Sequence, residues 1–368
     1  MNIGVNFAFF EDKINFGVGL FSIQLLYGML SEDKHNKYII FVTDKVYENI
    51  KNKFKDFDVE IIPLKSKFTQ SYYISKFYRL FFELPATVRG CKLDCYINLY
   101  TVWYNFVPKN IRNINVVHDL HFKYYPDFYS FIMLRIIKYR IKHILKKSSS
   151  IIAISEYVKK DVIEFCGDKC NAKISTIPNP VNVEVSDKGN RSKYILQVNS
   201  FMPWKNQITL LKAYSRLILQ NRNFPYKLVL IGYGTADELN EYIQVNNLED
   251  KVMVEQNISA AKLKSYYENA RLFVNTSLFE GFGRGNIEAA MMMVPVLTID
   301  VMCMREVSFD LFQYYSPATD DAVLAKKILE CLEQDMDDKK LSYIKEKCQF
   351  EYNLQKVANQ YIQVIDSI

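Results

Sequence analysis

Short apolar segments alternate with amphipathic helical patterns along the whole chain. Segments with the length and composition of buried strands lie at 2–9, 38–43, 59–64, 95–100, 114–120, 150–155, 174–178, 194–200, 227–234, 251–256, 271–277 and 294–299. Between them run stretches such as 206–220 and 237–247, in which apolar residues recur every three or four positions. Strands that helices cover on both faces show continuous apolar runs of this kind. The alternation predicts an α/β fold built from doubly wound parallel sheets.

About a dozen strands are too many for one sheet of this type, and the middle of the chain provides a boundary. Residues 174–193 concentrate proline, asparagine and glycine, and a new strand begins at Tyr194. The sequence therefore predicts two Rossmann-like domains, 1–183 and 184–350, that face each other across a cleft. We expect the last helix, at about 351–368, to pack back on the first domain.

Composition narrows the class of protein. Hydrophobic residues make up 49% and charged residues 24% of the chain, which is typical of a globular protein. The sequence contains no uncharged apolar run of the roughly 18 residues that a membrane-spanning helix needs, and its first residues do not have the pattern of a signal peptide. Its seven cysteines form no CxxC pair. We expect them to be free thiols in a reducing compartment, which places the protein in the cytoplasm.

Charge is distributed unevenly. Residues 1–180 carry 26 Lys and Arg against 17 Asp and Glu, whereas the rest of the chain is slightly acidic. A basic first half indicates an anionic partner. The sequence contains no helix-turn-helix, zinc-finger or RNA-recognition signature, so nucleic acid is not the expected partner.

The segment 271–299 contains the strongest candidate for a ligand site. A predicted strand is followed by a loop with Gly281, Gly283 and Gly285, and then by a helix. Glycines let the backbone approach a ligand closely, and the N-terminus of a helix attracts phosphate. Glu280 and Glu288 lie on either side of this loop. Glu280 would follow the carboxyl end of a strand, where ligands bind in such sheets.

Glu280 and Glu288 also form an E-x7-E pattern that resembles the retaining GT-B glycosyltransferases of family 4, also called group 1. The resemblance extends over nearly the whole chain. Its further matches are Gly17-Val-Gly19, His118-Asp119, IAISEYVKKDV at 152–162, IPNPVN at 177–182, Lys205-Asn206, LVLIGYG at 228–234, Pro295-Val296 and the C-terminal helix at 351–365. The chain differs from the family pattern at Asn199 and Ser200, where an arginine is common.

The resemblance implies a GT-B fold and transfer of a sugar from a nucleotide diphosphate donor with retention of anomeric configuration. By position, Glu280 would hold the donor sugar and stabilise its developing positive charge, and Glu288 would accept hydrogen bonds from the ribose. Lys205 would bind the diphosphate. His118 would face the donor sugar and the acceptor hydroxyl. Neither a metal ion nor another cofactor is expected, because lysine and a helix N-terminus would neutralise the leaving group.

Main-chain contacts complete the site that the resemblance implies. The backbone amides of Phe282, Gly283 and Arg284 would line the sugar and the phosphates. Gly17 and Gly19 would bring backbone close to the phosphate and the acceptor. The nucleobase would lie near residues 256–258, which include Asn257.

Two charged segments outside these motifs need an interpretation. Asp56-Phe57-Asp58 has the D-x-D spacing of manganese-dependent transferases, but it precedes a predicted strand within a lysine-rich stretch. We interpret it as solvated surface charge. Residues 131–147 contain six Lys and Arg and no acidic residue. This segment predicts either an ordinary surface helix packed on the core or a basic amphipathic face that binds anionic lipid, together with residues 65–82.

The sequence thus predicts a metal-independent hexosyltransferase of cell-surface polysaccharide synthesis. Mannose or a similar hexose would pass from a nucleotide sugar to a glycan or a lipid-linked acceptor. One alternative remains, a non-catalytic nucleotide-sugar or glycan-binding protein of the same fold. A nucleotide-sugar epimerase would have a similar architecture, but epimerases lack this glutamate spacing. The expected location is the cytoplasm, either free or attached peripherally to the inner face of the membrane.

Overall fold

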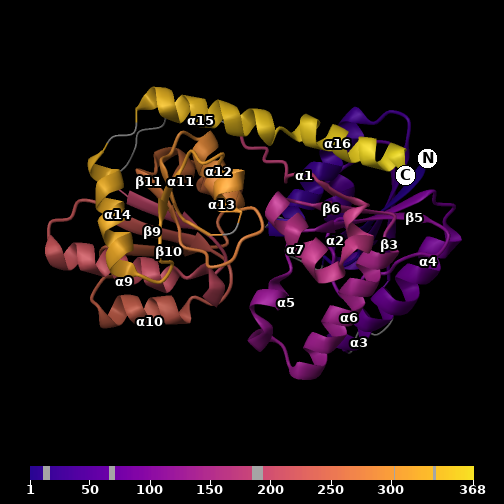
Figure 1. Ribbon diagram of the computed structural model, residues 1–368, viewed down its shortest axis with the longest axis horizontal. Helices are drawn as coiled ribbons and strands as arrows, with labels where there is room; N and C mark the ends of the chain where they lie inside the picture. Colours follow the sequence, from indigo (N-terminus) through magenta and orange to yellow (C-terminus); the bar gives the residue numbers. More distant parts are fainter. Residues whose placement is uncertain (11–16, 66–70, 185–193, 302, 335–336) are drawn as a thin grey trace. The chain divides into compact units, whose positions relative to one another are not determined.

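The chain forms two compact units. The computed structural model describes residues 1–10, 17–65, 71–184, 194–301, 303–334 and 337–368 (Figure 1). The first unit comprises Met1–Asn182 together with Tyr352–Ile368, and the second comprises Val183–Glu351. The end of the predicted polar bridge, 185–193, and part of the segment 65–82 lie outside the described residues.

The first unit contains a parallel sheet of seven strands. They are β1 (Asn2–Phe7), β2 (Lys37–Thr43), β3 (Val59–Leu64), β4 (Cys95–Asn98), β5 (Arg112–Val117), β6 (Ser150–Ala153) and β7 (Ile174–Thr176). Their order across the sheet is β3-β2-β1-β4-β5-β6-β7. The direction in which strands are added therefore reverses between β1 and β4, as in a doubly wound fold.

The first unit also contains helices, and all but the last of them lie between its strands in the sequence. They are α1 (Gly17–Glu32), α2 (Asp44–Lys53), α3 (Tyr72–Tyr78), η1 (Arg79–Glu83), α4 (Leu84–Gly90), α5 (His121–Tyr124), η2 (Pro126–Phe128), α6 (Phe131–Lys147), α7 (Glu156–Cys166), α8 (Asp168–Asn171) and α16 (Leu354–Ser367). Serine side chains cap the N-termini of two of them. Ser130 accepts a hydrogen bond from the backbone N–H of Met133, and Ser155 accepts one from that of Val158.

The second unit contains a parallel sheet of six strands in the order β10-β9-β8-β11-β12-β13. They are β8 (Tyr194–Val198), β9 (Lys227–Gly232), β10 (Val252–Gln256), β11 (Leu272–Asn275), β12 (Val296–Ile299) and β13 (Gln313–Tyr315). The helices are η3 (Pro203–Lys205), α9 (Gln207–Gln220), α10 (Asp237–Val245), α11 (Ala260–Asn269), α12 (Arg284–Met291), α13 (Met304–Val307), α14 (Asp321–Glu333) and α15 (Asp338–Glu351). The strand order is that of the Rossmann fold, and it reverses between β8 and β11.

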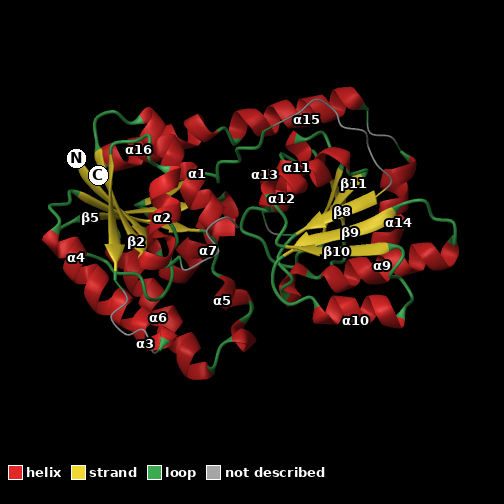
Figure 2. Cartoon of the chain, turned by 180° about the vertical axis from the view of Figure 1, so that it is seen from behind, coloured by secondary structure: helices red, strands yellow, loops and turns green. Residues whose placement is uncertain are grey.

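Helices cover both faces of the second sheet, which explains why its strands are apolar along their length. Helix α9 contacts α10 and α14, and helix α12 contacts α11 and α15 (Figure 2). The core between the sheet and the helices includes Leu196 in β8, Leu210 in α9 and Leu230 in β9, all of which are fully buried. No described helix has both the length and the apolar character needed to cross a membrane.

Helix α16 packs against α1 in the first unit. A Cβ added to Gly28 of α1 would lie 3.0 Å from Cβ of Ala358, so any larger residue would require the neighbouring side chains of α16 to shift. The helical conformation is interrupted between α15 and α16. Asn353 caps the N-terminus of α16, since its side chain accepts a hydrogen bond from the backbone N–H of Lys356.

The prediction of an α/β fold with two Rossmann-like domains is confirmed. The sequence analysis missed one strand, β13 (Gln313–Tyr315). This strand has three residues and begins with glutamine, so it shows no apolar run that would predict it. The first strand is also shorter than predicted, since it ends at Phe7 and the chain turns there, with the N–H of Phe10 donating to the carbonyl oxygen of Phe7.

Replacing Gly232 by alanine is expected to lower the free energy of unfolding of the second unit by about 1–3 kcal/mol. An added Cβ would lie 2.0 Å from the backbone oxygen of Asn199, in the loop that follows β8. Backbone atoms cannot yield as a flexible side chain can. The measurement is denaturant-induced unfolding, monitored by circular dichroism.

The matched control is Gly90→Ala, because a Cβ at Gly90 meets nothing within 4 Å. We expect this variant to unfold like the wild type. Equal stability of Gly232→Ala and Gly90→Ala would contradict the close approach of the end of β9 to the loop after β8.

Candidate functional site

The loops after β8 and β11 lie at the point where the strand order of the second unit reverses. In open α/β sheets, ligands bind beyond the carboxyl ends of the strands at such a point, because the two loops diverge and leave a crevice. The loop after β8 leads through η3 to α9, and the loop after β11 leads to α12. These two loops carry most of the site residues that the sequence predicted.

Hydrogen bonds join the two loops directly. The hydroxyl of Thr276 lies 2.9 Å from the backbone oxygen of Lys205 and 3.0 Å from that of Asn206. The backbone N–H of Leu278 donates to the carbonyl oxygen of Trp204 at 2.8 Å. Because Thr276 is fully buried, these bonds are shielded from water. They fix the position of Lys205 relative to the residues that follow β11.

Lys205 and Glu280 form an ion pair in this position. The ammonium nitrogen Nζ of Lys205 donates to Oε1 of Glu280 at 2.6 Å, and both side chains are 14% exposed. An ammonium group has three N–H donors, and this pair uses one of them. The structure therefore brings together two residues that are 75 positions apart and leaves both with capacity to bind a ligand.

A tight turn separates Glu280 from α12 (Arg284–Met291). Gly283 has a φ of 77°, a backbone conformation that residues with a side chain rarely adopt. A Cβ at this position would lie 2.9 Å from Cε of Met304. Phe282 is buried beside it. The turn places the backbone of Phe282, Gly283 and Arg284 at the N-terminus of the helix, which carries partial positive charge.

Glu288 lies on the first turns of α12 and accepts two hydrogen bonds. Nε of Arg284 donates to Oε1 at 2.7 Å, and the hydroxyl of Tyr267 donates to Oε2 at 3.0 Å. Burial, followed by the neighbouring Glu288 carboxylate, raises the pKa of Tyr267 well above its ordinary value, so the hydroxyl remains a donor. The carboxylate of Glu288 is thus held in one orientation.

Asn257 follows β10 at the same edge of the sheet, where it adopts a left-handed φ of 53° and is exposed. Beside it, the ends of β9 and β10 surround a hollow of about 290 Å³ that is lined by Gly234, Asp237 and Gln256, among others. The side chain of Gln256 donates to the backbone oxygen of Gly234 at 2.9 Å. The hollow has polar walls at the edge where the sequence places the nucleobase.

His118 lies in the first unit, directly after β5, and is 6% exposed. Its Nε2 lies 2.9 Å from the backbone oxygen of Leu99, which can only accept, so Nε2 carries the proton. Burial lowers the pKa of His118 to about 4, although the bond to Leu99 acts in the opposite direction. The ring of Phe21 packs edge-on against the imidazole. His118 is therefore a neutral histidine whose Nδ1 carries the lone pair.

Gly17 and Gly19 form the start of α1 in the first unit. Gly17 has a φ of 51° and is exposed, whereas Gly19 is buried. The preceding residues 11–16 lie outside the described part of the chain. Like His118, these glycines follow strands of the first sheet, so the predicted site residues fall into one group in each unit.

Sequence reasoning missed three residues that support this site. Tyr267 orients Glu288, Thr276 joins the two loops, and the buried thiol of Cys303 donates to the backbone oxygen of Glu280 at 3.4 Å. Burial raises the pKa of Cys303 well above its ordinary value, so it is a thiol rather than a thiolate. Thr276 lies near the carboxyl end of the predicted strand 271–277, which was a usable signal, but nothing marks Tyr267 among 26 tyrosines.

All seven cysteines are free, as the sequence predicted. Asp56 and Asp58 are exposed in the turn before β3, at the amino end of that strand. Within the described residues, no group of three or more His, Cys, Asp or Glu side chains has an arrangement that could hold a metal ion.

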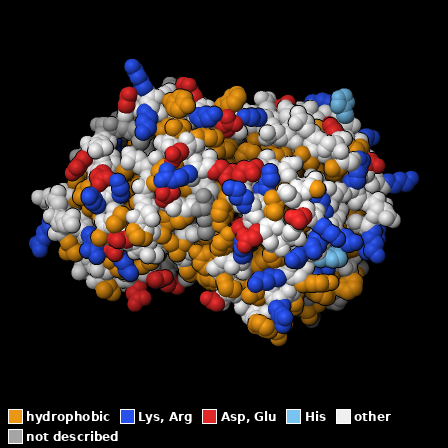
Figure 3. Space-filling model, viewed as in Figure 1, with side chains coloured by type: hydrophobic (Ala, Val, Ile, Leu, Met, Phe, Trp, Pro, Cys, Tyr) orange, Lys and Arg blue, Asp and Glu red, His pale blue; other side chains and the backbone are white. Residues whose placement is uncertain are grey.

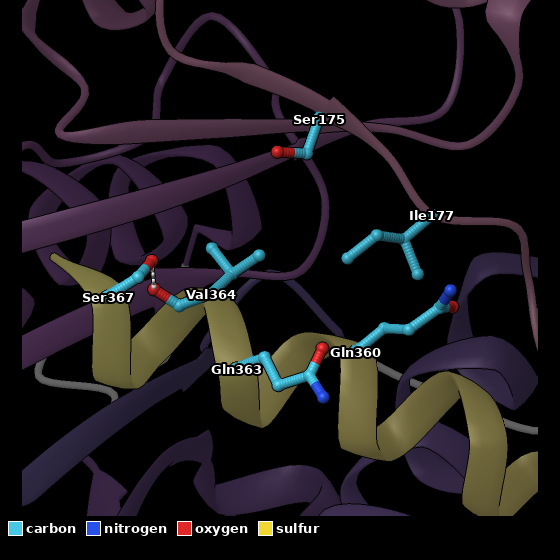
Figure 4. Close-up of a pocket in the computed structure, with 6 residues that line it drawn as sticks. All are labelled: Ser175, Ile177, Gln360, Gln363, Val364 and Ser367. Atoms are coloured by element: carbon cyan, nitrogen blue, oxygen red, sulfur yellow. Dashed lines mark hydrogen bonds between the residues drawn. The ribbon is translucent and has the colours of Figure 1, made fainter.

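A second hollow, of about 310 Å³, lies between the end of β7 and α16 in the first unit (Figure 4). Its lining residues are Ser175, Ile177, Gln360, Gln363, Val364 and Ser367. These side chains carry no charge, so the hollow lacks the groups that would bind a phosphate. It is not part of the candidate site.

Comparison with known families identifies what kind of protein has this arrangement. Residues 180–348 match the family model described as glycosyl transferases group 1, and residues 52–185 match the one described as glycosyltransferase family 4. The chain belongs to this family of glycosyltransferases. The E-x7-E segment and Lys205 both fall within the group 1 match.

Curated relatives in this family include two O-antigen chain mannosyltransferases. The one from Salmonella typhimurium is 30% identical over 228 residues, which span 61% of this chain and 62% of the relative. The one from Escherichia coli is 25% identical over 249 residues, which span 62% of this chain and 64% of the relative. The chain thus matches a little less than two thirds of the length of either relative.

Solved structures of glycosyltransferases share the fold. Sucrose-phosphate synthase from Thermosynechococcus elongatus superposes with a TM-score of 0.77 at 16% identity, covering 100% of this chain and 98% of that one. This likeness and the two Rossmann-like units show that the family member described here has the GT-B fold.

His118 is expected to remain neutral between pH 8 and about 5.5, because its pKa is lowered from 6.5 to about 4. The measurement is long-range ¹H–¹⁵N NMR of the ring nitrogens, with the signal assigned by its loss in His118→Gln. Glutamine can keep the bond to Leu99. A ring that titrates near its ordinary pKa would contradict the buried environment.

The same shift has a consequence for stability. Between pH 6.5 and 4 the unfolded chain binds a proton at this histidine that the folded chain does not bind. The free energy of unfolding of the wild type therefore falls more steeply with decreasing pH than that of His118→Gln.

Proposed function

We propose that this protein transfers a hexosyl group from a nucleotide diphosphate sugar to a glycan or a lipid-linked acceptor in cell-surface polysaccharide synthesis. The observation that carries the proposal is the Lys205–Glu280 pair at the reversal of strand order in the second unit. The family and the names of its O-antigen mannosyltransferase relatives support it. They favour mannose as the donor sugar.

The reaction breaks the bond between the anomeric carbon and a diphosphate oxygen. The electron pair leaves with the nucleoside diphosphate, a new bond forms to the acceptor oxygen, and the acceptor proton passes to the departing phosphate. Negative charge grows on the diphosphate, so cationic groups there lower the barrier. Lys205 is the proposed partner of this charge, assisted by the N-terminus of α12 and by the backbone of Phe282, Gly283 and Arg284.

Glu280 is proposed to act on the sugar. Its Oε1 is held by Lys205, and its Oε2 remains able to accept a hydrogen bond from a sugar hydroxyl. A carboxylate beside the ring also stabilises the positive charge that develops at the anomeric carbon. This arrangement supports a retaining mechanism, in which acceptor and leaving group use the same face of the sugar.

Glu288 is proposed to bind the ribose of the donor. Arg284 and Tyr267 each donate to one of its oxygens, which orients the carboxylate before the ligand arrives. Each oxygen keeps a second lone pair for a ribose hydroxyl. The hollow beside Asn257 and Gln256 is the proposed place of the nucleobase.

In the first unit, His118, Gly17 and Gly19 are proposed to serve the acceptor and the phosphate. A histidine with a pKa of about 4 is a weak base at neutral pH, so its role is to accept a hydrogen bond through Nδ1 rather than to remove a proton. The neutral ring positions a hydroxyl, and the proton leaves with the phosphate.

Glu280→Gln and Lys205→Ala are each expected to lower turnover at least ~10²-fold, because both residues meet charge that grows in the transition state. The measurement is release of nucleoside diphosphate from a panel of UDP and GDP sugars. Since the two residues form one pair, the double variant should lose less than the product of the two single losses.

Glu249→Gln and Lys227→Ala make the same chemical changes at exposed positions of the second unit and serve as controls. Glu288→Gln should mainly weaken donor binding. Near-normal turnover of Glu280→Gln with an intact fold would refute the assignment. Nucleotide binding without any turnover in the wild type would favour a non-catalytic binding protein.

Turnover is expected to change less than about twofold when EDTA is added, because Lys205 and the N-terminus of α12 take the role that a divalent cation plays in other transferases. The assay is the same, with manganese and magnesium restored in parallel. A roughly tenfold loss that manganese reverses would show that a cation neutralises the leaving diphosphate.

A further inference from the structure

Helix α6 exposes large apolar side chains that its own packing does not require. Its inner face is formed by Ile137, Ile141, Ile144 and Leu145, all buried in the first unit. Outside this stripe, Phe131 is 71% exposed, Ile132 is 72% exposed and Tyr139 is 70% exposed. One apolar stripe is enough to anchor a surface helix, so the second apolar set has no function in the fold.

The helices α3 and η1 of the same unit add to this exposed set. Tyr73, Ile74, Phe77 and Phe82 are each more than half exposed. The loop at Trp103 connects the two groups: Nε of Arg140 in α6 donates to its backbone oxygen, and Phe81 of η1 lies against its ring. A protein that remains in water seldom exposes so many large apolar side chains in one region.

Basic residues lie among these apolar side chains. Arg135, Lys138, Lys142, Lys146 and Lys147 are exposed on α6, and the helix has no acidic residue. In Figure 3, orange and blue side chains are interleaved over the end of the first unit that carries α6 and α3 in Figure 1. The guanidinium of Arg135 lies 5.2 Å from the centre of the Phe131 ring, so charge and apolar surface alternate over short distances.

We propose that this basic–aromatic surface, formed by α6, α3 and η1, binds the surface of an anionic lipid bilayer. Aromatic and aliphatic side chains enter the boundary between headgroups and acyl chains, while lysine and arginine reach the lipid phosphates. Double-stranded nucleic acid would contact the cations through its phosphates and would leave Phe131, Ile132 and Tyr139 in water. The surface belongs to the first unit alone, so the proposal does not depend on the donor site in the second.

The test is co-sedimentation of the full chain with vesicles of phosphatidylglycerol and phosphatidylcholine, beside vesicles of phosphatidylcholine alone. We expect binding to the anionic vesicles that falls at least about tenfold as salt rises from about 0.05 to about 0.5 M. Wild-type protein that stays in the supernatant with anionic vesicles, or that binds both kinds of vesicle equally, would overturn the proposal.

Two variants divide the surface into its charged and apolar parts. Lys138→Gln/Lys142→Gln/Lys146→Gln is expected to lower binding at least about tenfold, and Phe131→Ser/Ile132→Ser several-fold, with melting temperatures unchanged because all five side chains are exposed. Unaltered binding by the triple variant would overturn the proposal.

Matched controls come from the second unit. Lys326→Gln/Lys339→Gln/Lys340→Gln removes the same charge, and Leu219→Ser/Val245→Ser removes similar exposed apolar area. Both should bind like the wild type, and a loss equal to that of the α6 variants would overturn the assignment to this surface. Analytical ultracentrifugation without lipid tests whether a second copy of the chain occupies the surface instead. A wild-type dimer that the Phe131→Ser/Ile132→Ser substitutions dissociate, together with no vesicle binding, would identify the surface as an interface between copies of the chain and would overturn the proposal.

Discussion

The loops after β8 and β11 leave neighbouring strands at the point where the strand order reverses, and buried hydrogen bonds hold the starts of these loops together. The hydroxyl of Thr276 and the N–H of Leu278 bind backbone oxygens of Trp204, Lys205 and Asn206. A buried polar group that loses its partner is costly, so these bonds resist separation of the loops. The Lys205–Glu280 pair depends on them, because neither side chain could keep its place if one loop moved.

In the first unit, buried amide side chains hold the strand ends that carry candidate residues. Side chains of Asn6 in β1, Asn98 in β4 and Asn115 in β5 form a chain of hydrogen bonds of 2.8 and 2.9 Å across the sheet. They lie just before the loops that contain Leu99 and His118. The backbone oxygen of Leu99 accepts the hydrogen bond that keeps the His118 proton on Nε2. Because Asn98 directly precedes Leu99, the row of amides helps to hold this oxygen, and through it the histidine ring, in place. Polar networks at the carboxyl ends of the strands therefore support both groups of candidate residues.

Periodicity was sufficient to predict the fold, because strands covered on both faces and amphipathic helices have distinct patterns. It failed at β13, where three residues pair with β12 through main-chain bonds that no side-chain pattern reports. The sequence also offered Glu280 and Glu288 as candidate site residues, because their spacing around a glycine loop can be recognised without a structure. It could not reveal that Tyr267 donates to Glu288, because that contact joins α11 to α12 across the fold.

Charge compensation distinguishes the donor site from the basic–aromatic surface. Lys205 and Arg284 each face a glutamate and are 14% and 15% exposed, so little of either charge is screened by water. Burying such a cation alone would be costly, and the paired glutamates offset that cost. A diphosphate bound as proposed would add negative charge beside Lys205 without displacing Glu280, since the ammonium has donors for both. Five of the six cations of α6 are exposed, so water already solvates them, and the helix contains no acidic residue. The first arrangement suits the proposed binding of one anion in a defined place, whereas the second suits the proposed contact with an extended anionic surface, in which no single group is fixed.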